Sequence, residues 1–459
     1  MATATVAIPQ NQQKTILGHP KGLFVLFFTE MWERFSYYGM RSLLVLYMTD
    51  YLLSNPEKAA SVFGFGAVRH ALEAVFGPLA TQPLASQMYG LYTGFVYFTP
   101  FFGGILADRL WGQRKTVVIG GILMAIGHFL MASESMFLVA LFFLIIGNGA
   151  FKPNISTQVG LLYPEGDTRR DGAFTIFYMG INLGAFLSPL ICGTLGQKVG
   201  WHYGFGAAGV GMIIGLIVYL WGQKHLAPDN IMQKKAADQK EEPLTKDDWK
   251  KVWALVALCA LNIVFWGVYE QQGNTMQIWA DKNTDWNFFG WEMPSTWFQS
   301  MNPAMIFAFA PLLNIFWAKQ ASKKKEPSSV SKMALGCIMM GVAFIIMMIV
   351  GGITPADGKA SVLWLVATMT IVTLGELYLS PIGLSLVTKV SPARIVSMMM
   401  GMWFLSSFFG NYLSGYLGGY YDTMSKQGFF GLMTVLGIVA GLMIFAANKP
   451  LKKIIGHNV

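Results

Sequence analysis

Residues 21–53 read KGLFVLFFTEMWERFSYYGMRSLLVLYMTDYLL, an apolar run that is long enough to cross a membrane yet carries charges in its middle. On a helix, the positions 3, 4, 7 and 11 residues after Glu30 share its face, and they hold Glu33, Arg34, Tyr37 and Arg41. A charge at the centre of a bilayer costs at least about 2.5 kcal/mol, so such residues face a bundle interior or a water-filled cavity. The stripe therefore points to a membrane protein with a polar path through it, as in a transporter.

The composition agrees with a chain that lies mostly in a membrane. Of its 459 residues 54% are hydrophobic and only 12% are charged, whereas a soluble domain has about 25% charged residues. The net charge of +9 comes from basic residues in short loops between apolar runs, so no nucleic-acid-binding face is predicted. The cysteines, Cys192, Cys259 and Cys337, are far apart and lie in apolar runs, which excludes a disulfide framework or a metal site. No cofactor is expected.

Hydropathy predicts an all-α membrane protein with about twelve transmembrane helices. The expected spans are 22–52, 87–107, 116–132, 136–163, 172–195, 203–222, 251–279, 295–318, 331–352, 361–388, 395–420 and 428–447. Basic residues gather in alternate connections, so the positive-inside rule places both termini in the cytoplasm, as in a multi-pass protein of the inner or plasma membrane. The N-terminus has no apolar core for a cleavable signal peptide, and we expect the first span to direct insertion.

Two longer connections divide the chain. Residues 54–86 form an external insertion, and its stretch SVFGFGAVRHALEAVF could be a short amphipathic helix on the membrane surface. Residues 223–250 are polar and charged, which is typical of a cytoplasmic linker. The predicted organisation is therefore a tail over 1–21, a six-helix bundle over 22–222, the linker, a second six-helix bundle over 251–447 and a tail over 448–459.

This layout is similar to that of the major facilitator superfamily, whose two six-helix bundles are repeats of one another. The segment GILADRLWGQRK, residues 104–115, also resembles the loop motif that follows the second helix in that superfamily. Its glycines allow a tight turn, and Asp108 and Arg109 can tie helix ends together.

Other polar residues lie deep in apolar spans: Lys152, Asn182, Glu270, Asn302 and Glu376. The charged ones could instead extend to an interface, and the asparagines could instead bond neighbouring helices. At 1.5 Å per residue, Arg41 and Glu270 are both about 29 Å from the cytoplasmic start of their spans. Lys152 and Glu376 are both near mid-membrane. Because these spans are equivalent in a two-bundle repeat, we predict two gate pairs, Arg41 with Glu270 and Lys152 with Glu376.

The first-span pattern Glu-x-x-Glu-Arg-Phe-x-Tyr-Tyr-Gly, from Glu30 to Gly39, resembles the signature of the proton-dependent oligopeptide transporter family. FYMGINLG, residues 177–184, is similar to the family's second signature. The resemblance implies that Glu376 and Asn302 hold the amino terminus of a peptide. It further implies that its carboxylate and backbone are held by Arg41, Lys152, Tyr37, Tyr38, Tyr97 and Asn182, and that other contacts come from Trp266, Glu270, Ser380 and Trp403.

The chain also departs from relatives. Residues 223–250 are too short and too polar for the two extra helices of many bacterial members. The helix 2 histidine of animal members aligns with Gly90, and His128, the only histidine deep in a span, is interpreted as structural. Proton coupling is therefore expected from Glu30 or Glu33 together with Arg34, and the sequence does not decide between the two carboxylates.

These observations predict a monomeric proton-coupled symporter that imports di- and tripeptides by alternating access, with membrane lipid as its surroundings. One alternative is a relative that moves another small anion or zwitterion, such as nitrate or a modified amino acid. Another is a peptide-sensing receptor. An enzyme is disfavoured, because no metal cluster, Ser/His pair or phosphate loop appears at membrane depth.

Overall fold

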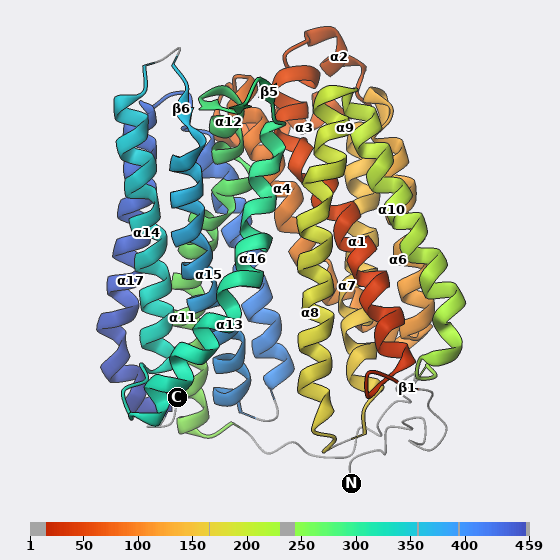
Figure 1. Cartoon of the computed structure of the whole chain (residues 1–459), viewed down its shortest axis with the longest axis vertical. Coiled ribbons are helices and arrows are strands. Elements are labelled where there is room, and N and C mark those ends of the chain that lie inside the picture. The colour runs from red at the N-terminus through yellow and green to blue at the C-terminus, as the bar shows by residue number, and fades with distance from the viewer. Residues whose placement is uncertain (1–14, 165, 230–243, 356–357, 393–394, 456–459) are drawn as a thin grey trace. The chain divides into compact units, whose positions relative to one another are not determined.

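The computed structural model describes residues 15–164, 166–229, 244–355, 358–392 and 395–455, and they are largely helical. The tails and linker predicted from the sequence fall partly outside these residues, over 1–14, 230–243 and 456–459. Within the described chain, twelve long helical segments follow one another, and the prediction of about twelve spans is confirmed. Figure 1 shows the course of the chain through these helices, coloured by residue number.

The first six segments are α1 (Lys21–Leu46, continued by Tyr47–Leu52), α4 (Thr81–Phe98, continued by α5, Pro100–Leu106, and Ala107–Trp111), α6 (Gln113–Leu130), α7 (Phe137–Leu161), α8 (Arg169–Ser188, continued by Pro189–Gly193 and α9, Thr194–Lys198) and α10 (Trp201–Gly222). The second six are α11 (Lys246–Tyr269, continued by Glu270–Gly273 and α12, Thr275–Lys282), α13 (Met301–Ser322), α14 (Ser329–Ile353), α15 (Val362–Val390), α16 (Val396–Gly418) and α17 (Lys426–Ile455). Two short helices, α2 (Pro56–Ser61) and α3 (Phe65–Phe76), precede α4.

Nine of these described segments are long and apolar enough to cross a membrane on composition alone. α1 is a continuous helix of 26 residues, but the charged residues of its polar face lower its mean hydropathy. The described chain also contains three pairs of two-residue strands, one before α1 and two near the ends of helices in the second half. β1 (Thr15–Ile16) pairs antiparallel with β2 (His19–Pro20), β3 (Thr284–Asp285) pairs parallel with β6 (Ala360–Ser361), and β4 (Asn287–Phe288) pairs antiparallel with β5 (Trp291–Glu292).

By their contacts, the helices form two compact units. The first unit contains residues 15–70 and 98–229, and the second contains 71–97 and 244–455, so that α4 groups with the later helices. α4 begins at Thr81 rather than at the predicted residue 87. Its first turns carry polar side chains that hydropathy counts against a span, but these are buried: Gln82 donates to the carbonyl of Gly418 at 2.9 Å, and Ser86 donates to Asn274 at 2.8 Å.

The start of α11 also differs from the prediction, which extended the linker to residue 250. Thr245 accepts a hydrogen bond from the backbone of Asp248, and the Asp248 side chain accepts one from the backbone of Thr245. This capping box begins the helix at Lys246, before its apolar run starts.

Glycines let the helices that carry the polar residues pack closely. A Cβ atom on Gly184 of α8 would lie 2.2 Å from the carbonyl oxygen of Met31 in α1, and one on Gly180 would lie 2.9 Å from the ring of Phe27. Glycines four residues apart allow such backbone approach in membrane helices. In the second unit, a Cβ atom on Gly375 of α15 would lie 2.8 Å from the carbonyl oxygen of Gly336 in α14. These contacts fix the helices that hold Glu30 and Glu376.

Candidate transport site

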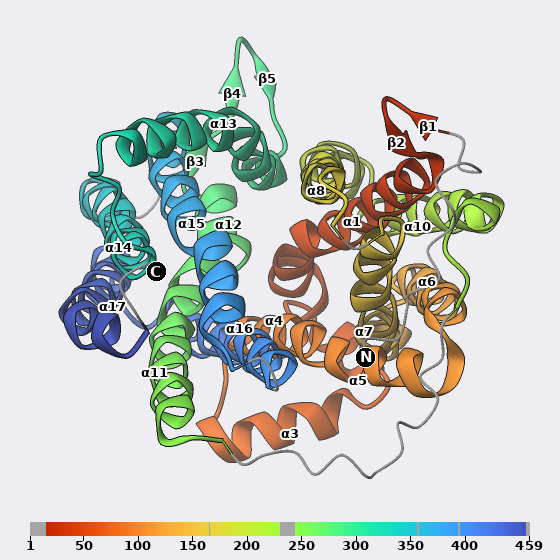
Figure 2. The ribbon, with the colours of Figure 1, turned by 90° about the horizontal axis from the view of Figure 1, so that it is seen from below.

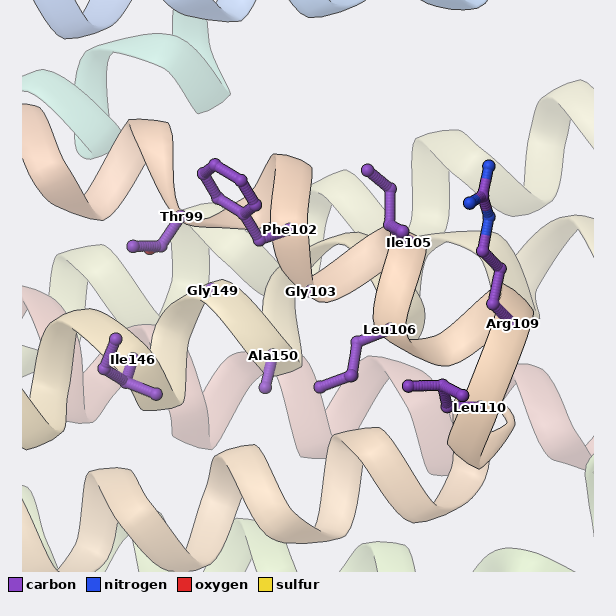
Figure 3. A pocket seen from close by; sticks show the side chains of 10 residues that line it. All are labelled: Thr99, Phe102, Gly103, Ile105, Leu106, Arg109, Leu110, Ile146, Gly149 and Ala150. Atoms are coloured by element: carbon purple, nitrogen blue, oxygen red, sulfur yellow. The ribbon is translucent and has the colours of Figure 1, made fainter.

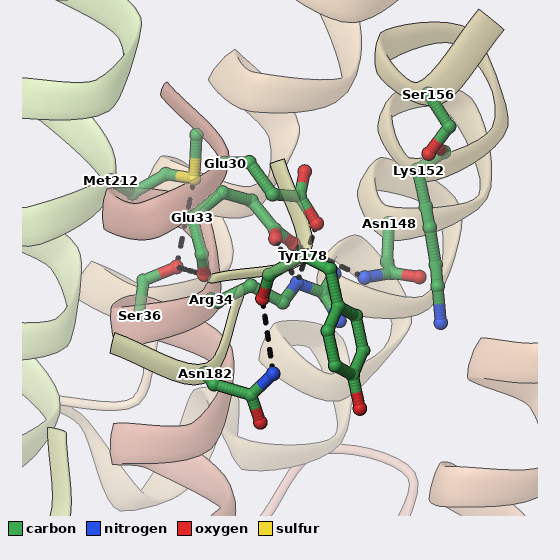
Figure 4. Close-up of polar contacts among 10 residues, drawn as sticks. All are labelled: Glu30, Glu33, Arg34, Ser36, Asn148, Lys152, Ser156, Tyr178, Asn182 and Met212. Carbon is green, nitrogen blue, oxygen red and sulfur yellow. Dashed lines mark hydrogen bonds and ion pairs between the residues drawn. The ribbon is translucent and has the colours of Figure 1, made fainter. Parts of the chain in front are cut away.

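Three charged residues of α1 form a buried ion-pair cluster in the first unit (Figure 4). The Arg34 guanidinium binds both carboxylate oxygens of Glu33, with its Nη2 atom 2.7 Å from Oε1, and its Nε atom lies 3.3 Å from Oε1 of Glu30. All three side chains are at most 3% exposed. Asn148 of α7 adds a hydrogen bond to Glu33 at 3.3 Å. Helical spacing brought these α1 residues onto one face, and the structure shows them in direct contact.

The two carboxylates of this cluster differ in how well they are satisfied. Both oxygens of Glu33 have partners, and Oε1 has two. Glu30 is joined to Arg34 through Oε1 alone, and its buried Oε2 has no hydrogen-bond partner within the described residues. Lys152, on α7 one turn after Asn148, lies close enough for its charge to act on Glu30. Glu30 therefore keeps an oxygen that can accept a proton or a hydrogen bond.

Aromatic rings continue the polar face of α1. The Arg34 guanidinium lies 5.1 Å from the centre of the Tyr37 ring and 6.0 Å from that of Tyr38, and Arg41 lies 5.9 Å from the Tyr38 ring. Tyr38 is thus positioned between two cations, which is favourable because a ring face carries partial negative charge. Asn182 of α8 is buried and donates to the carbonyl of Tyr178 in its own helix at 3.0 Å, so its oxygen and its second N–H can meet a ligand.

A second cluster lies in the second unit and is centred on Glu376 of α15. The amide nitrogen of Asn302, from α13, donates to Glu376 Oε2 at 2.8 Å and to the Thr373 hydroxyl at 3.1 Å. Tyr269 of α11 is within hydrogen-bonding reach of the same carboxylate, and the charge of Glu270 acts on it. Glu270 itself is 1% exposed. This unit therefore presents two neighbouring carboxylates.

The aromatic residues expected near the substrate lie on α11 and α16. Trp266 packs edge-on against Tyr269, with ring centres 5.2 Å apart, and its buried indole nitrogen has no hydrogen-bond partner among the described atoms. Trp403 lies over Gly383 so closely that a Cβ atom there would be 2.1 Å from the indole ring. Ser380 follows Glu376 by one turn of α15 and is half-buried.

The remaining residues named from the sequence lie outside these two clusters or take part in pairs between the units. Tyr97 is half-buried near the end of α4 and groups with the second unit. His128 is fully buried in α6, and neither ring nitrogen has a hydrogen-bond partner in the described part of the chain. The pairs Arg41 with Glu270 and Lys152 with Glu376 each take one residue from each unit, and they remain predictions.

Three residues of the clusters were missed from the sequence: Asn148, Thr373 and Tyr269. Asn148 and Lys152 are four residues apart on α7, so helical spacing from Lys152 could have identified the asparagine. Thr373 likewise precedes Glu376 by three residues on α15.

A cavity of about 500 Å³ lies between α5 and α7 in the first unit (Figure 3). Its lining is apolar apart from Thr99 at one end and Arg109 at the other, and it includes no residue of either cluster. A zwitterionic solute needs partners for both charges, so this cavity is not the expected substrate site.

Comparison with known proteins assigns the family. The pattern that defines the POT family matches residues 114–243 and 229–436. The chain is 33% identical to a di-/tripeptide transporter of Lactococcus lactis subsp. cremoris, covering 97% of this chain and 98% of that one. It belongs to the POT family.

Other members of the POT family agree over the whole chain. An uncharacterised transporter, YclF, of Bacillus subtilis (strain 168) is 35% identical and covers 96% of each chain. A crystal structure of a variant of peptide transporter POT in complex with alafosfalin is 32% identical, with a TM-score of 0.84 over 97% of this chain and 98% of that chain. As a POT family member the protein is a multi-pass membrane transporter with the major facilitator fold, and the resemblance seen in the first-span signature is confirmed.

Proposed function

We propose that this POT family member is a proton-coupled symporter that imports di- and tripeptides by alternating access. The contact between Asn302 and Glu376 supports the proposal most directly, because it presents a half-buried carboxylate in a fixed orientation. A free peptide has an ammonium group at one end and a carboxylate at the other. The carboxylates of the second unit suit the ammonium group, and the cations Arg41 and Lys152 of the first unit suit the peptide carboxylate.

The proposed site excludes some alternatives by its charge. Nitrate or another simple anion would leave Glu376 and Glu270 facing like charge, which disfavours binding. A zwitterion other than a peptide could satisfy both charges but would not span amide-binding groups such as Asn182. Peptide uptake into proteoliposomes with an imposed proton gradient tests the proposal. Uphill accumulation of a dipeptide, blocked by free dipeptides but not by nitrate, is expected. Binding without accumulation would instead support a peptide-sensing receptor.

We assign the coupled proton to Glu30 within this proposal. Glu33 is held by two bonds from Arg34 and one from Asn148, so a proton there would have to displace an existing partner. A proton on Glu30 Oε2 displaces none among the described residues. Protonation of Glu30 weakens its attraction to Arg34, which is then more available to a ligand carboxylate. Binding of proton and peptide would in this way favour one another.

The gate pairs, the membrane and the assembly complete the proposal. Arg41 with Glu270, and Lys152 with Glu376, are proposed to pair in one state of the cycle and to separate in another. We place the protein in the inner or plasma membrane as a monomer, with both termini in the cytoplasm and no cofactor other than the coupling proton. Protease access to a tag at either terminus in sealed cells tests the orientation.

A further inference from the structure

The connection between α12 and α13 contains a hairpin whose tip exposes apolar aromatic side chains. The strands β4 and β5 pair Asn287 with Glu292 and Phe288 with Trp291, so Phe289 and Gly290 form the two-residue loop. Phe289 is 97% exposed, Phe288 is 59% exposed and Trp291 is 50% exposed. The rings of Phe288 and Phe289 contact one another, with centres 4.7 Å apart. The tip from 286 to 291 has no charged residue, whereas Asp285 and Glu292 flank its base.

The backbone at this tip is strained as well as exposed. Phe289 has a φ of 51° and Gly290 one of 84°, as a tight hairpin turn of this kind requires. Glycine, asparagine or aspartate usually occupies the first position of such a turn, because a bulky side chain with positive φ costs on the order of 1–3 kcal/mol. Compared with asparagine or aspartate, a phenylalanine at this position makes the turn less stable and exposes an apolar ring to water. An apolar environment around the tip offsets that cost.

The base of the hairpin is rigid, so the tip has a defined position. Trp286 is 5% exposed, and its indole nitrogen donates to the carbonyl of Ala280 at 2.6 Å. The backbone of Met293 donates to the carbonyl of Trp286 at 3.1 Å, and Gly290 donates to the Asn287 side chain at 2.9 Å. Strand β3, just before the hairpin, pairs with β6. Trp291 packs edge-on against Trp297, with ring centres 5.4 Å apart, and this contact holds one side of the hairpin, while Phe288 and Phe289 project away from the helices.

The position of the tip relative to the second unit identifies what surrounds it. The hairpin lies between the apolar segments Lys246–Lys282 and Ser295–Ser322. It therefore belongs to the connection between two membrane-spanning helices and lies near their ends. Viewed along the helix axes, β4 and β5 extend sideways beyond α13 (Figure 2). A tip that projects sideways from the end of a membrane-spanning helix would lie over lipid. Aromatic side chains are enriched in the interfacial layer of a bilayer, where their rings lie among the headgroups.

We propose that Phe288, Phe289 and Trp291 insert into the headgroup layer of the bilayer and anchor this end of the second unit. The partner is the lipid surface itself, recognised through aromatic burial rather than through charge. This inference does not depend on the identity of the transported solute.

A nitroxide label at position 289 tests the insertion. The native cysteines are at most 4% exposed, so Phe289→Cys gives one accessible thiol, and unmodified protein carried through the same labelling gives the background. Lys359→Cys is the matched control, because Lys359 is exposed and directly precedes β6, which pairs with β3 at the base of the hairpin. The protein is reconstituted into vesicles of phosphatidylethanolamine and phosphatidylglycerol. Collisions of the label with oxygen, which concentrates in lipid, are compared with collisions with a water-soluble nickel complex.

Insertion predicts that oxygen relaxes the label at 289 more than nickel does, and that the order reverses at 359. The same label on Phe288→Cys gives a second measurement of oxygen and nickel access, at the neighbouring aromatic residue. Equal nickel access at 289 and 359 would place the tip in water and overturn the proposal. Protection of 289 from both reagents would place it against protein, such as a second copy of the chain, and would overturn the proposal as well.

Discussion

The side-chain amide of Asn302 donates to the carboxylate of Glu376 at 2.8 Å, joining α13 to α15 at a half-buried position of the second unit. The same amide nitrogen donates to Thr373 at 3.1 Å, so the orientation of Asn302 is fixed from two sides. A carboxylate held in this way is prepared to receive a cation without rearranging, which reduces the cost of binding.

We expect Glu376→Gln to abolish dipeptide binding and uptake, because the ammonium group loses its half-buried ionic partner. Asn302→Ala should weaken binding by about 10- to 100-fold, which corresponds to a charged hydrogen bond worth about 1.5–3 kcal/mol. Thr373→Val is the control and should have a smaller effect, since it leaves the bond between Asn302 and Glu376 intact. Calorimetry or competition gives the affinities. Equal competition by N-acetylated and free dipeptides in the wild type would contradict the assignment.

The two carboxylates of the first cluster should respond differently to neutralisation. Glu30→Gln should abolish gradient-driven accumulation while peptide counterflow continues, because only the proton site is lost. Glu33→Gln should reduce both, and should also lower the thermal stability, since removing one member of a buried ion pair costs about 3–5 kcal/mol. Uphill uptake by the Glu30 variant at the wild-type rate would show that the coupled proton binds elsewhere.

Close packing of α1 and α8 gives a prediction about stability. Gly184→Ala should lower the melting temperature in detergent, because the new Cβ atom would meet a backbone oxygen that has little freedom to move. Gly206→Ala in α10 is the control: nothing lies within 4 Å of a Cβ atom there, and alanine favours a helix over glycine by about 1 kcal/mol. We expect Gly206→Ala to be neutral or stabilising. A similar loss in both variants would argue against the packing explanation.

The gate pair of Arg41 with Glu270 can be tested by exchanging the two charges. Arg41→Glu and Glu270→Arg should each abolish transport. The double variant should recover part of the closure of the transport path. Closure is measured as protection of a cysteine placed in that path from a water-soluble thiol reagent. Recovery need not extend to uptake, because Arg41 is also expected to meet the peptide carboxylate. If the double variant is as open as either single variant, other residues make the gate.

Helical periodicity and hydropathy were sufficient for most of the fold. Most spans agree with the helices to within a few residues. The larger differences are at the start of α4, where buried polar side chains such as Gln82 begin the helix, at the start of α11, and at the end of α17, which extends to Ile455 rather than to residue 447. The cluster around Arg34 was also predictable, because its partners lie on the same helix. The contact between Asn302 and Glu376 joins two helices, and no spacing within one helix reveals it. Uncharged members such as Asn148 were missed because an amide in an apolar span is commonly structural.

Gly90 shows how a departure from relatives acquires a physical reason only in the fold. A Cβ atom at this position of α4 would lie 2.6 Å from the Cα atom of Gly415 in α16. The two backbones touch, so neither a histidine nor any other side chain fits without separating the helices. The sequence alone indicated a missing histidine, whereas the structure shows a position that requires glycine.

The glycine seam between α1 and α8 has a consequence for the orientation of the charges. Successive residues of a helix differ by 100° around its axis, so a rotation of α1 by one position would turn Glu30 and Arg34 away from the interior. Gly180 and Gly184 bring backbone against Phe27 and Met31, and these contacts set the angle of the whole helix. The packing of Phe27 and Met31 against the two glycines of α8 therefore determines in which direction the charged groups of α1 point.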